Sequence, residues 1–162
     1  MEVKREFYWI AATVFLLACQ SEPSRTVESV PEVVKTKDQT KTLVVPWNVG
    51  VNDSTDMMEI RKDPASDMTN LGPKDIIDAL NLKHPQIKLS WVQQTGTKAF
   101  IKIDDASYLT QRSGTQGAQA YLAEVTYSLT ELKGISAVDF SFEEGDHAVP
   151  GTYTRDDFVN FN

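Results

Sequence analysis

A chain of 162 residues has room for one domain of ordinary size. Its 23 Asp and Glu outnumber its 16 Lys and Arg, and a net charge of -7 disfavours nucleic acid and anionic headgroups as partners through general electrostatics. The single cysteine, Cys19, excludes an internal disulfide framework and any metal site built from several cysteines.

The first 18 residues have the pattern of a bacterial export signal. Lys4 and Arg5 form a short basic start, and an apolar run follows from Phe7 to Ala18. A run of about a dozen residues suits the core of a signal peptide, whereas a helix that spans a bilayer needs roughly 20. The run ends Leu16-Leu17-Ala18-Cys19, which resembles the lipobox of bacterial lipoproteins. We therefore expect export and removal of residues 1–18.

The lipobox resemblance implies that the Cys19 sulfur takes up a diacylglyceryl group. Two or more acyl chains, at about 0.8 kcal/mol per buried methylene, would anchor the protein to the cell membrane or the outer membrane. Residues 19–41 are polar, contain two prolines and lack an apolar periodicity. They predict a flexible linker with a reach of roughly 25 Å, which places the domain in the periplasm or cell-wall space. The alternative is a free cysteine at the end of an ordinary leader.

Residues 42–162 are expected to form one folded domain. A β-rich apolar run at 43–47 predicts a first strand, and residues 57–61 predict a second short strand. A helix is predicted over 73–82, because it opens on a proline and carries apolar residues at helical spacing. His84-Pro85 ends this helix, which makes His84 a cap-region residue rather than a catalytic base.

The next segment has the clearest hairpin pattern of the chain. Apolar residues alternate over 87–91 and again over 99–103, and turn residues lie between them at 94–97. Phe100 belongs to the polar-facing set of the second strand.

The longest helix is predicted over 115–133. Ser113 and Gln116 have capping-box spacing at its start, and Gly134 suits a left-handed residue after its end. Its apolar residues fall within about 100° of the helical wheel. Tyr127 lies on the far side of that stripe, so it is the aromatic residue that we expect to be most exposed.

After the long helix, apolar and polar residues alternate over 138–143, which predicts a strand buried on one face. Residues 149–153 suggest a brief return and 156–162 a tail. The order of elements predicts an α+β fold, with a mixed or antiparallel sheet and two helices packed on one face, a β-β-α-β-β-α-β sandwich. The long helix separates two strands that could lie parallel through a crossover.

Five segments of the domain share the pattern of one known family: Val44-Val45-Pro46, Lys98–Asp104, Tyr121–Gly134, Ile135–Phe140 and Thr154-Arg155-Asp156. They resemble the first strand, the strand ending in an acid, the hallmark helix, the following strand and the ending of the GerM-type domain. This domain occurs in sporulation and spore-germination lipoproteins and in other bacterial envelope proteins. The resemblance covers roughly residues 42–158. It implies a lipoprotein that helps organise envelope complexes, and it transfers no catalytic residues.

The sequence departs from the GerM-type pattern at the first helix, which is short. The loop that follows lacks the family's usual longer approach to the hairpin. No partner surface in this region can be carried over from the family.

One cluster of possible metal ligands stands near the end of the domain: Glu143, Glu144, Asp146 and His147. Three such side chains could hold a hard cation or Zn²⁺. The cluster lies across a tight glycine turn, where charges are usually solvated, so we predict no metal and no other cofactor.

No acid, base and nucleophile converge in the sequence pattern. The chain has two histidines and no nucleophile-elbow motif. Asp104-Asp105 could be paired acids, but neighbours on a strand point to opposite sides of the sheet. We predict that the protein is not an enzyme.

These observations favour a non-catalytic lipoprotein whose domain docks another envelope protein, held at the membrane by the lipid on Cys19. A sheet with helices on one face leaves the other face free, where Asp139 and Phe100 could line a partner surface together with Tyr127. The alternative is a periplasmic lipoprotein that binds a small ligand or a glycan.

Overall fold

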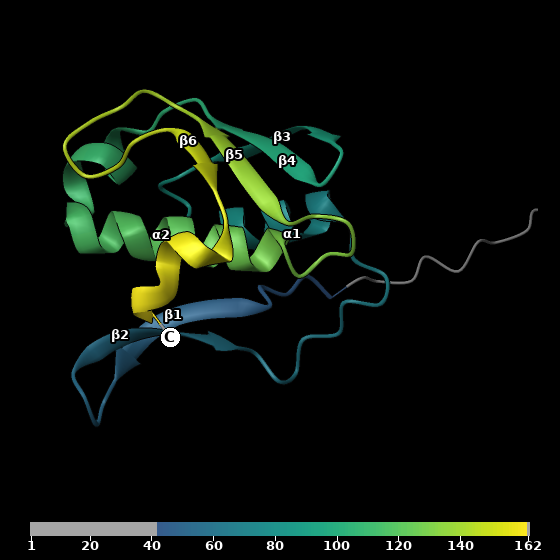
Figure 1. Cartoon of the computed structure of the whole chain (residues 1–162), viewed down its shortest axis with the longest axis horizontal. Helices are drawn as coiled ribbons and strands as arrows, with labels where there is room; N and C mark the ends of the chain where they lie inside the picture. Colours follow the sequence, from purple (N-terminus) through teal and green to yellow (C-terminus); the bar gives the residue numbers. More distant parts are fainter. Residues whose placement is uncertain (1–41, 162) are drawn as a thin grey trace, which may run out of the picture. The chain divides into compact units, whose positions relative to one another are not determined.

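The computed structural model describes residues 42–161, and the predicted leader, Cys19 and linker lie outside the described residues. The described strands are β1 Trp47–Asn52, β2 Met57–Lys62, β3 Leu89–Thr95, β4 Lys98–Ile103, β5 Ala137–Ser141 and β6 Gly151–Tyr153. The α-helices are α1 Pro73–Lys83 and α2 Gly114–Leu129. The chain runs β-β-α-β-β-α-β as predicted, followed by the short β6, and the α+β class is confirmed (Figure 1).

Four strands form a mixed sheet in the order β3-β4-β5-β6. β3 and β4 make the predicted antiparallel hairpin, and β4 and β5 lie parallel, as the crossover through α2 allows. Along β4, Ala99, Ile101 and Ile103 are buried and alternate with more exposed residues. The buried set packs against the helices and forms the centre of the core.

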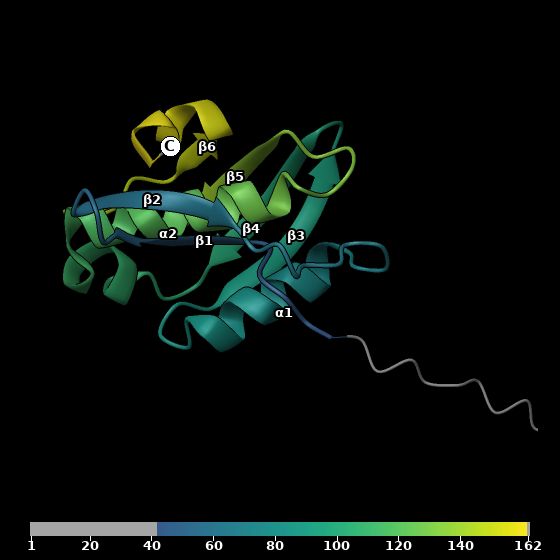
Figure 2. The same ribbon diagram turned by 90° about the horizontal axis from the view of Figure 1, so that it is seen from below.

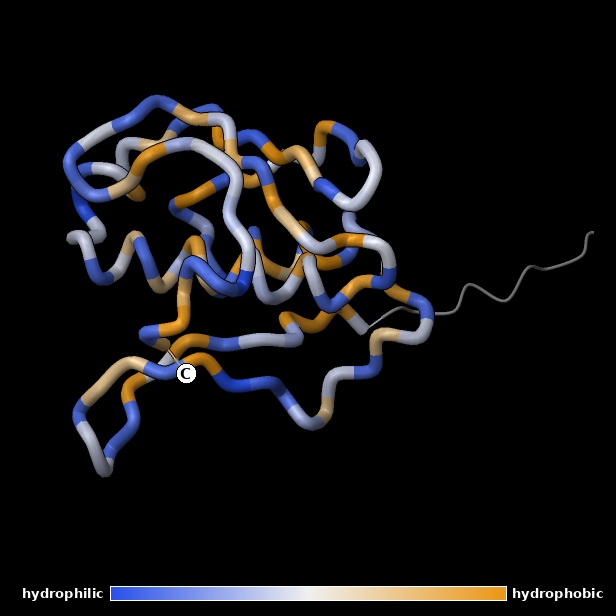
Figure 3. Tube along the Cα trace, viewed as in Figure 1, coloured by the Kyte–Doolittle hydropathy of each residue, from blue (hydrophilic) through white to orange (hydrophobic). Residues whose placement is uncertain are grey.

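The helices α1 and α2 contribute the other half of this core. Ile76 and Leu80 of α1 and Val125 and Leu129 of α2 are fully buried. Figure 3 shows that hydrophobic residues concentrate in the strands and along α2, whereas the connecting loops are mainly hydrophilic. None of the helices within residues 42–161 is both long and apolar enough to cross a membrane.

The strands β1 and β2 form a separate antiparallel sheet instead of joining the main one. They lie on the side of α2 that faces away from the four-stranded sheet (Figures 1 and 2). As a result α2 is a middle layer, and every residue from Tyr121 to Leu129 is buried.

The prediction that Tyr127 is exposed is therefore wrong. Tyr127 is 4% exposed, and its ring meets the Trp47 ring edge-on with 5.1 Å between the centroids. The physical reason is that β1 brings an apolar residue to the side of α2 that the helical-wheel pattern leaves polar.

Three element boundaries differ from the sequence pattern. The sequence pattern predicts a first strand that ends at Trp47, but β1 begins at this residue. Pro46 has no N–H to donate to a neighbouring strand, so it cannot lie inside the paired segment. α2 ends at Leu129, and a turn leads to Gly134, whose positive φ of 89° fits the predicted left-handed residue. Residues Arg155–Phe161 are not a tail but short 3-10 turns that bury Phe158 and Phe161.

The predicted capping box at Ser113 is also wrong. A π-helical turn, Tyr108–Arg112, leads directly into α2, so Ser113 already has helical backbone angles. The Ser113 hydroxyl donates back to the carbonyl of Leu109 at 2.6 Å. The hydroxyl therefore points away from the free N–H groups of the first turn of α2, which a capping side chain would bond.

Candidate functional site: a cleft at the carboxyl end of α2

A buried ionic cluster at the middle of α2 joins this helix to the end of α1 and to β1. The Glu124 carboxylate accepts from Lys83 Nζ at 2.8 Å and lies 3.1 Å from His84 Nε2, both at the end of α1. It also accepts from the Val49 N–H of β1 at 3.4 Å. Burial alone would raise the pKa of Glu124, but hydrogen bonds from His84 and Lys83 hold it below the ordinary value. His84 is the cap residue of α1, as predicted.

A second carboxylate, Glu131, joins the layers just beyond the end of α2. Its Oε2 accepts from Trp47 Nε1 at 2.9 Å and from Arg155 Nη2 at 3.0 Å, and its Oε1 pairs with Lys62 Nζ. The hydrogen bond from Lys62 is the main cause that lowers the pKa of Glu131, to about 2. Burial raises this pKa in part, and the hydrogen bonds from Trp47 and Arg155 lower it further. This carboxylate fixes the β1–β2 sheet and the chain end to α2.

Arg155 closes the carboxyl end of α2. Its guanidinium lies over the rings of Trp47 and Tyr127, at 5.0 and 4.8 Å from their centroids. Its Nη2 donates to the Tyr127 carbonyl at 3.1 Å and its Nε to Thr130 Oγ1 at 2.8 Å. A cation at this position adds a further donor to a carbonyl of the last turn and matches the negative end of the helix dipole.

The Glu131 cluster predicts an acid-sensitive fold. A carboxyl whose pKa is about 2 when folded and near 4.5 when unfolded stabilises the fold above pH 4.5. That contribution disappears as the pH falls from about 4.5 to 2, and Glu124 acts in the same direction. Glu131→Gln should therefore have a lower melting temperature than the wild type at pH 7. Between pH 7 and pH 2, the melting temperature of the wild type should fall more steeply than that of Glu131→Gln. Exposed Glu144→Gln is the control, and equal slopes for all three proteins would contradict the prediction.

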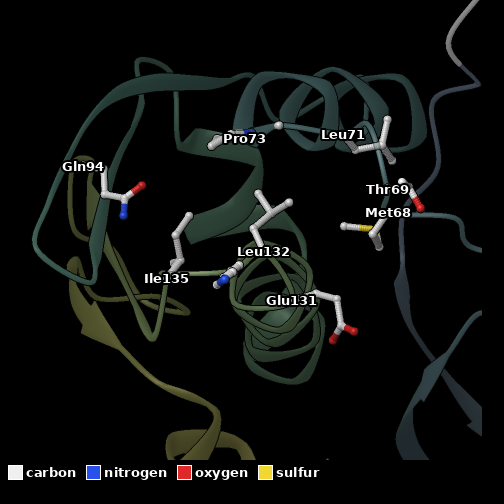
Figure 4. Close-up of a pocket in the computed structure, with 10 residues that line it drawn as sticks. Met68, Thr69, Leu71, Pro73, Gln94, Glu131, Leu132 and Ile135 are labelled. Atoms are coloured by element: carbon white, nitrogen blue, oxygen red, sulfur yellow. The ribbon is translucent and has the colours of Figure 1, made fainter.

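A cleft of about 550 Å³ opens beside Glu131, between the start of α1 and the turn after α2. Its apolar lining comes from Met68 and Leu71 of the loop before α1, from Pro73, and from Leu132 and Ile135 after α2. Figure 4 shows Leu132 and Ile135 facing Leu71 and Pro73 across the opening. Three stretches that are far apart in the sequence, 68–73, Gln94 and 131–135, thus meet in one concave surface.

The polar lining of the cleft includes Thr69 and the Glu131 carboxylate, which Lys62 and Arg155 pair, together with Gln94 and Lys133. Gln94 Nε2 donates to the carbonyls of Gly96 and Gly134, at 3.0 Å each, and so fixes the β3–β4 turn to the turn after α2. Lys133 is exposed at the rim, and no residue within 42–161 pairs with its ammonium group. The cleft therefore combines rigid walls, an apolar base and one free positive charge.

Two of the predicted surface residues lie elsewhere, on the outer face of the main sheet. Phe100 and Asp139 are register partners on β4 and β5, and both are half-buried. Thr152 Oγ1 donates to Asp139 at 2.6 Å, and Lys98 Nζ lies 5.8 Å from the Phe100 ring centroid. This face is polar and bonded within itself, and Tyr127 is not part of it.

The four candidate metal ligands divide between two places. Glu143 and Glu144 line a pocket of about 150 Å³ together with Asp104 and Asp105. Asp146 and His147 line a different pocket, of about 350 Å³. Within residues 42–161 no three His, Cys, Asp or Glu side chains are grouped so that they could hold a metal ion.

The tight turn at Gly145 explains this division. A Cβ at Gly145 would come within 2.7 Å of the Thr110 side chain, so the turn packs closely against the π-helical segment. The acidic residues before the turn and the pair after it therefore line separate pockets.

Sequence reasoning missed the cleft. Leu71, Leu132 and Ile135 approach one another only in the tertiary fold, so no local sequence pattern indicates the cleft. The one sequence signal was Gln94 in a hairpin turn.

Comparison of the chain with protein-family models, with curated proteins and with solved structures found no match in any of the three.

Proposed function

We propose that this protein is a non-catalytic lipoprotein of the cell envelope, whose domain docks another envelope protein in the cleft at the carboxyl end of α2. The observation that carries the proposal is the cleft itself, which is open, apolar at its base and bordered by the unpaired Lys133. Concave surfaces with an apolar base and few polar groups are the usual form of recognition sites.

The chemistry of the cleft defines the partner. Its apolar base fits one or two apolar side chains of an exposed segment. Lys133 places a positive charge at the rim of the cleft, on a chain whose net charge is -7. The expected partner therefore carries an acidic residue beside its apolar side chains.

Because hydrogen bonds and ion pairs already hold the walls of the cleft in place, little conformational entropy should be lost when a partner binds. On one side, Glu131 is held by Trp47, Lys62 and Arg155. On the other side, the Gln94 amide holds the turn at Gly134 in place. A site whose walls are fixed before binding loses less conformational entropy when a partner arrives.

The predicted lipid anchor supports the same function. A linker with a reach of roughly 25 Å confines the domain to a thin layer above the membrane. Confinement raises the effective concentration of any partner in that layer, so a weak contact can be occupied. The resemblance to the GerM-type family, whose members help organise envelope complexes, points in the same direction.

Charge reversal at the rim tests the proposed function. Crosslinking in intact cells, followed by mass spectrometry, should identify an envelope protein bound to the wild type. Lys133→Glu should reduce its recovery at least about tenfold, because like charges brought together at an interface cost several kcal/mol. The matched control is Lys88→Glu, an exposed lysine that does not line the cleft.

A compensating substitution makes this test specific. If an acidic residue of the partner is changed to Lys, recovery with Lys133→Glu should return. Unchanged recovery with Lys133→Glu, or equal loss with Lys88→Glu, would contradict docking in the cleft.

A further inference from the structure

A second pocket, of about 350 Å³, lies at the opposite end of α2. Its lining comes from the first turns of α2, the loop before β6, β6 itself and the 3-10 turns at the chain end. Leu122, Ala148, Phe158 and Phe161 form the buried part of its apolar lining, and Val149 is an exposed apolar residue of the same lining. Pockets of this size with an apolar base commonly hold small molecules.

An aromatic wall is fixed on one side of this pocket. The Tyr153 ring stacks on Phe158, with 5.6 Å between centroids and 21° between planes. Its hydroxyl donates to the Val149 carbonyl at 2.7 Å. The ring therefore cannot turn away, and a ligand would meet a preformed wall.

The polar lining has exposed side chains that no other described residue bonds. The side chains of Gln119, Asp146 and Asn160 line the pocket from three elements, and none has a partner among residues 42–161. His147 Nδ1 lies 3.2 Å from Thr115 Oγ1, which orients the imidazole ring and leaves its other nitrogen free. Three elements thus bring donors and acceptors to one opening.

The combination of these groups selects one class of ligand. An anion would be repelled by Asp146 and Asp157. A simple cation would suit the two carboxylates, but it has no acceptors for the amide N–H groups of Gln119 and Asn160. A neutral molecule rich in hydroxyl groups both donates to carboxylates and accepts from amides, and the C–H face of a sugar ring matches an apolar, aromatic lining.

We propose that this pocket binds a neutral saccharide, with Gln119, Asp146 and Asn160 as its hydrogen-bonding residues. The pocket and the cleft lie at the two ends of the 16-residue α2, about 24 Å apart at 1.5 Å per residue. The domain can therefore hold a saccharide and a protein partner at the same time. Such a protein would link its partner to a glycan-bearing surface.

The test uses the full-length protein in detergent micelles on an array of neutral mono- and oligosaccharides, with spermidine and inorganic phosphate as charged probes. At least one neutral saccharide should bind, and the charged probes should not compete with it. Gln119→Ala and Asn160→Ala should each weaken binding roughly three- to tenfold in a titration, as expected for one lost hydrogen bond. Gln116→Ala, an exposed residue of α2 outside the pocket, should leave binding unchanged.

Three results would overturn the proposal: no neutral saccharide bound above background, displacement of the saccharide by spermidine or phosphate, or equal binding by the pocket variants and the control. Lys133→Glu should bind the saccharide like the wild type. This readout separates failure of the saccharide pocket from failure of the proposed protein docking.

Discussion

Val125→Asp is expected to unfold the domain. Val125 is fully buried at the centre of α2, among the side chains of the main core. Because α2 lies between two sheets, the new carboxylate could not reach water by a small rotation of the helix. An unpaired buried charge costs several kcal/mol, which is comparable with the 5–15 kcal/mol that stabilise a typical domain.

Circular dichroism during thermal and urea unfolding measures this effect. The wild type should show a cooperative transition, and Val125→Asp should show little folded baseline at 25 °C. Gln116→Asp is the matched control, because it places the same charge on an exposed position of the same helix. If Val125→Asp melted like this control, the burial of this side of α2 would be wrong.

Cys19→Ser is expected to abolish lipid attachment. A serine hydroxyl is a much weaker nucleophile than a thiolate and would not take up the diacylglyceryl group.

Metabolic labelling with a fatty-acid probe tests the lipid directly. The wild type should carry the probe and sediment with membranes, whereas Cys19→Ser should carry none. A substitution in the linker, Ser24→Ala, should behave like the wild type. Equal labelling of wild type and Cys19→Ser would show that the lipobox resemblance is misleading.

Sequence patterns were most informative where one segment faces one environment. The helix predicted over 73–82 is α1, Pro73–Lys83, because a proline start and a helical apolar spacing agree. The hairpin of β3 and β4 was predictable because apolar residues alternate on both sides of a turn that contains glycine. In the structure Gly96 has a positive φ of 59°, as such a turn favours. β5 followed the same alternation.

Patterns failed where a segment faces two environments. The helical wheel of α2 identifies the side that packs on the main sheet, but the opposite side is buried by β1 and β2. Small and polar residues of α2 such as Thr126 and Ser128 are also fully buried, so composition alone could not reveal the second layer. The same effect misplaced Tyr127, whose partner Trp47 is 80 positions away in the sequence.

The candidate sites were the least predictable part of the molecule. Gln94, Leu132 and Leu71 come together only when β3, α2 and the loop before α1 take their tertiary positions. The chain end was predicted as a tail because its apolar residues, Phe158 and Phe161, do not follow a helical or strand period. Both are core residues that also form the base of the second pocket.

Site-specific photocrosslinking tests the proposed docking most directly. A photoreactive amino acid is placed at Leu132 in the cleft, and in a second strain at Ser141, an exposed residue on the outer face of β5. Irradiation of intact cells should give one discrete crosslinked band from Leu132 and none from Ser141, and Lys133→Glu should remove the Leu132 band. A band from Ser141 alone, or no band from either position in cells that hold the protein at its membrane, would contradict docking through the cleft.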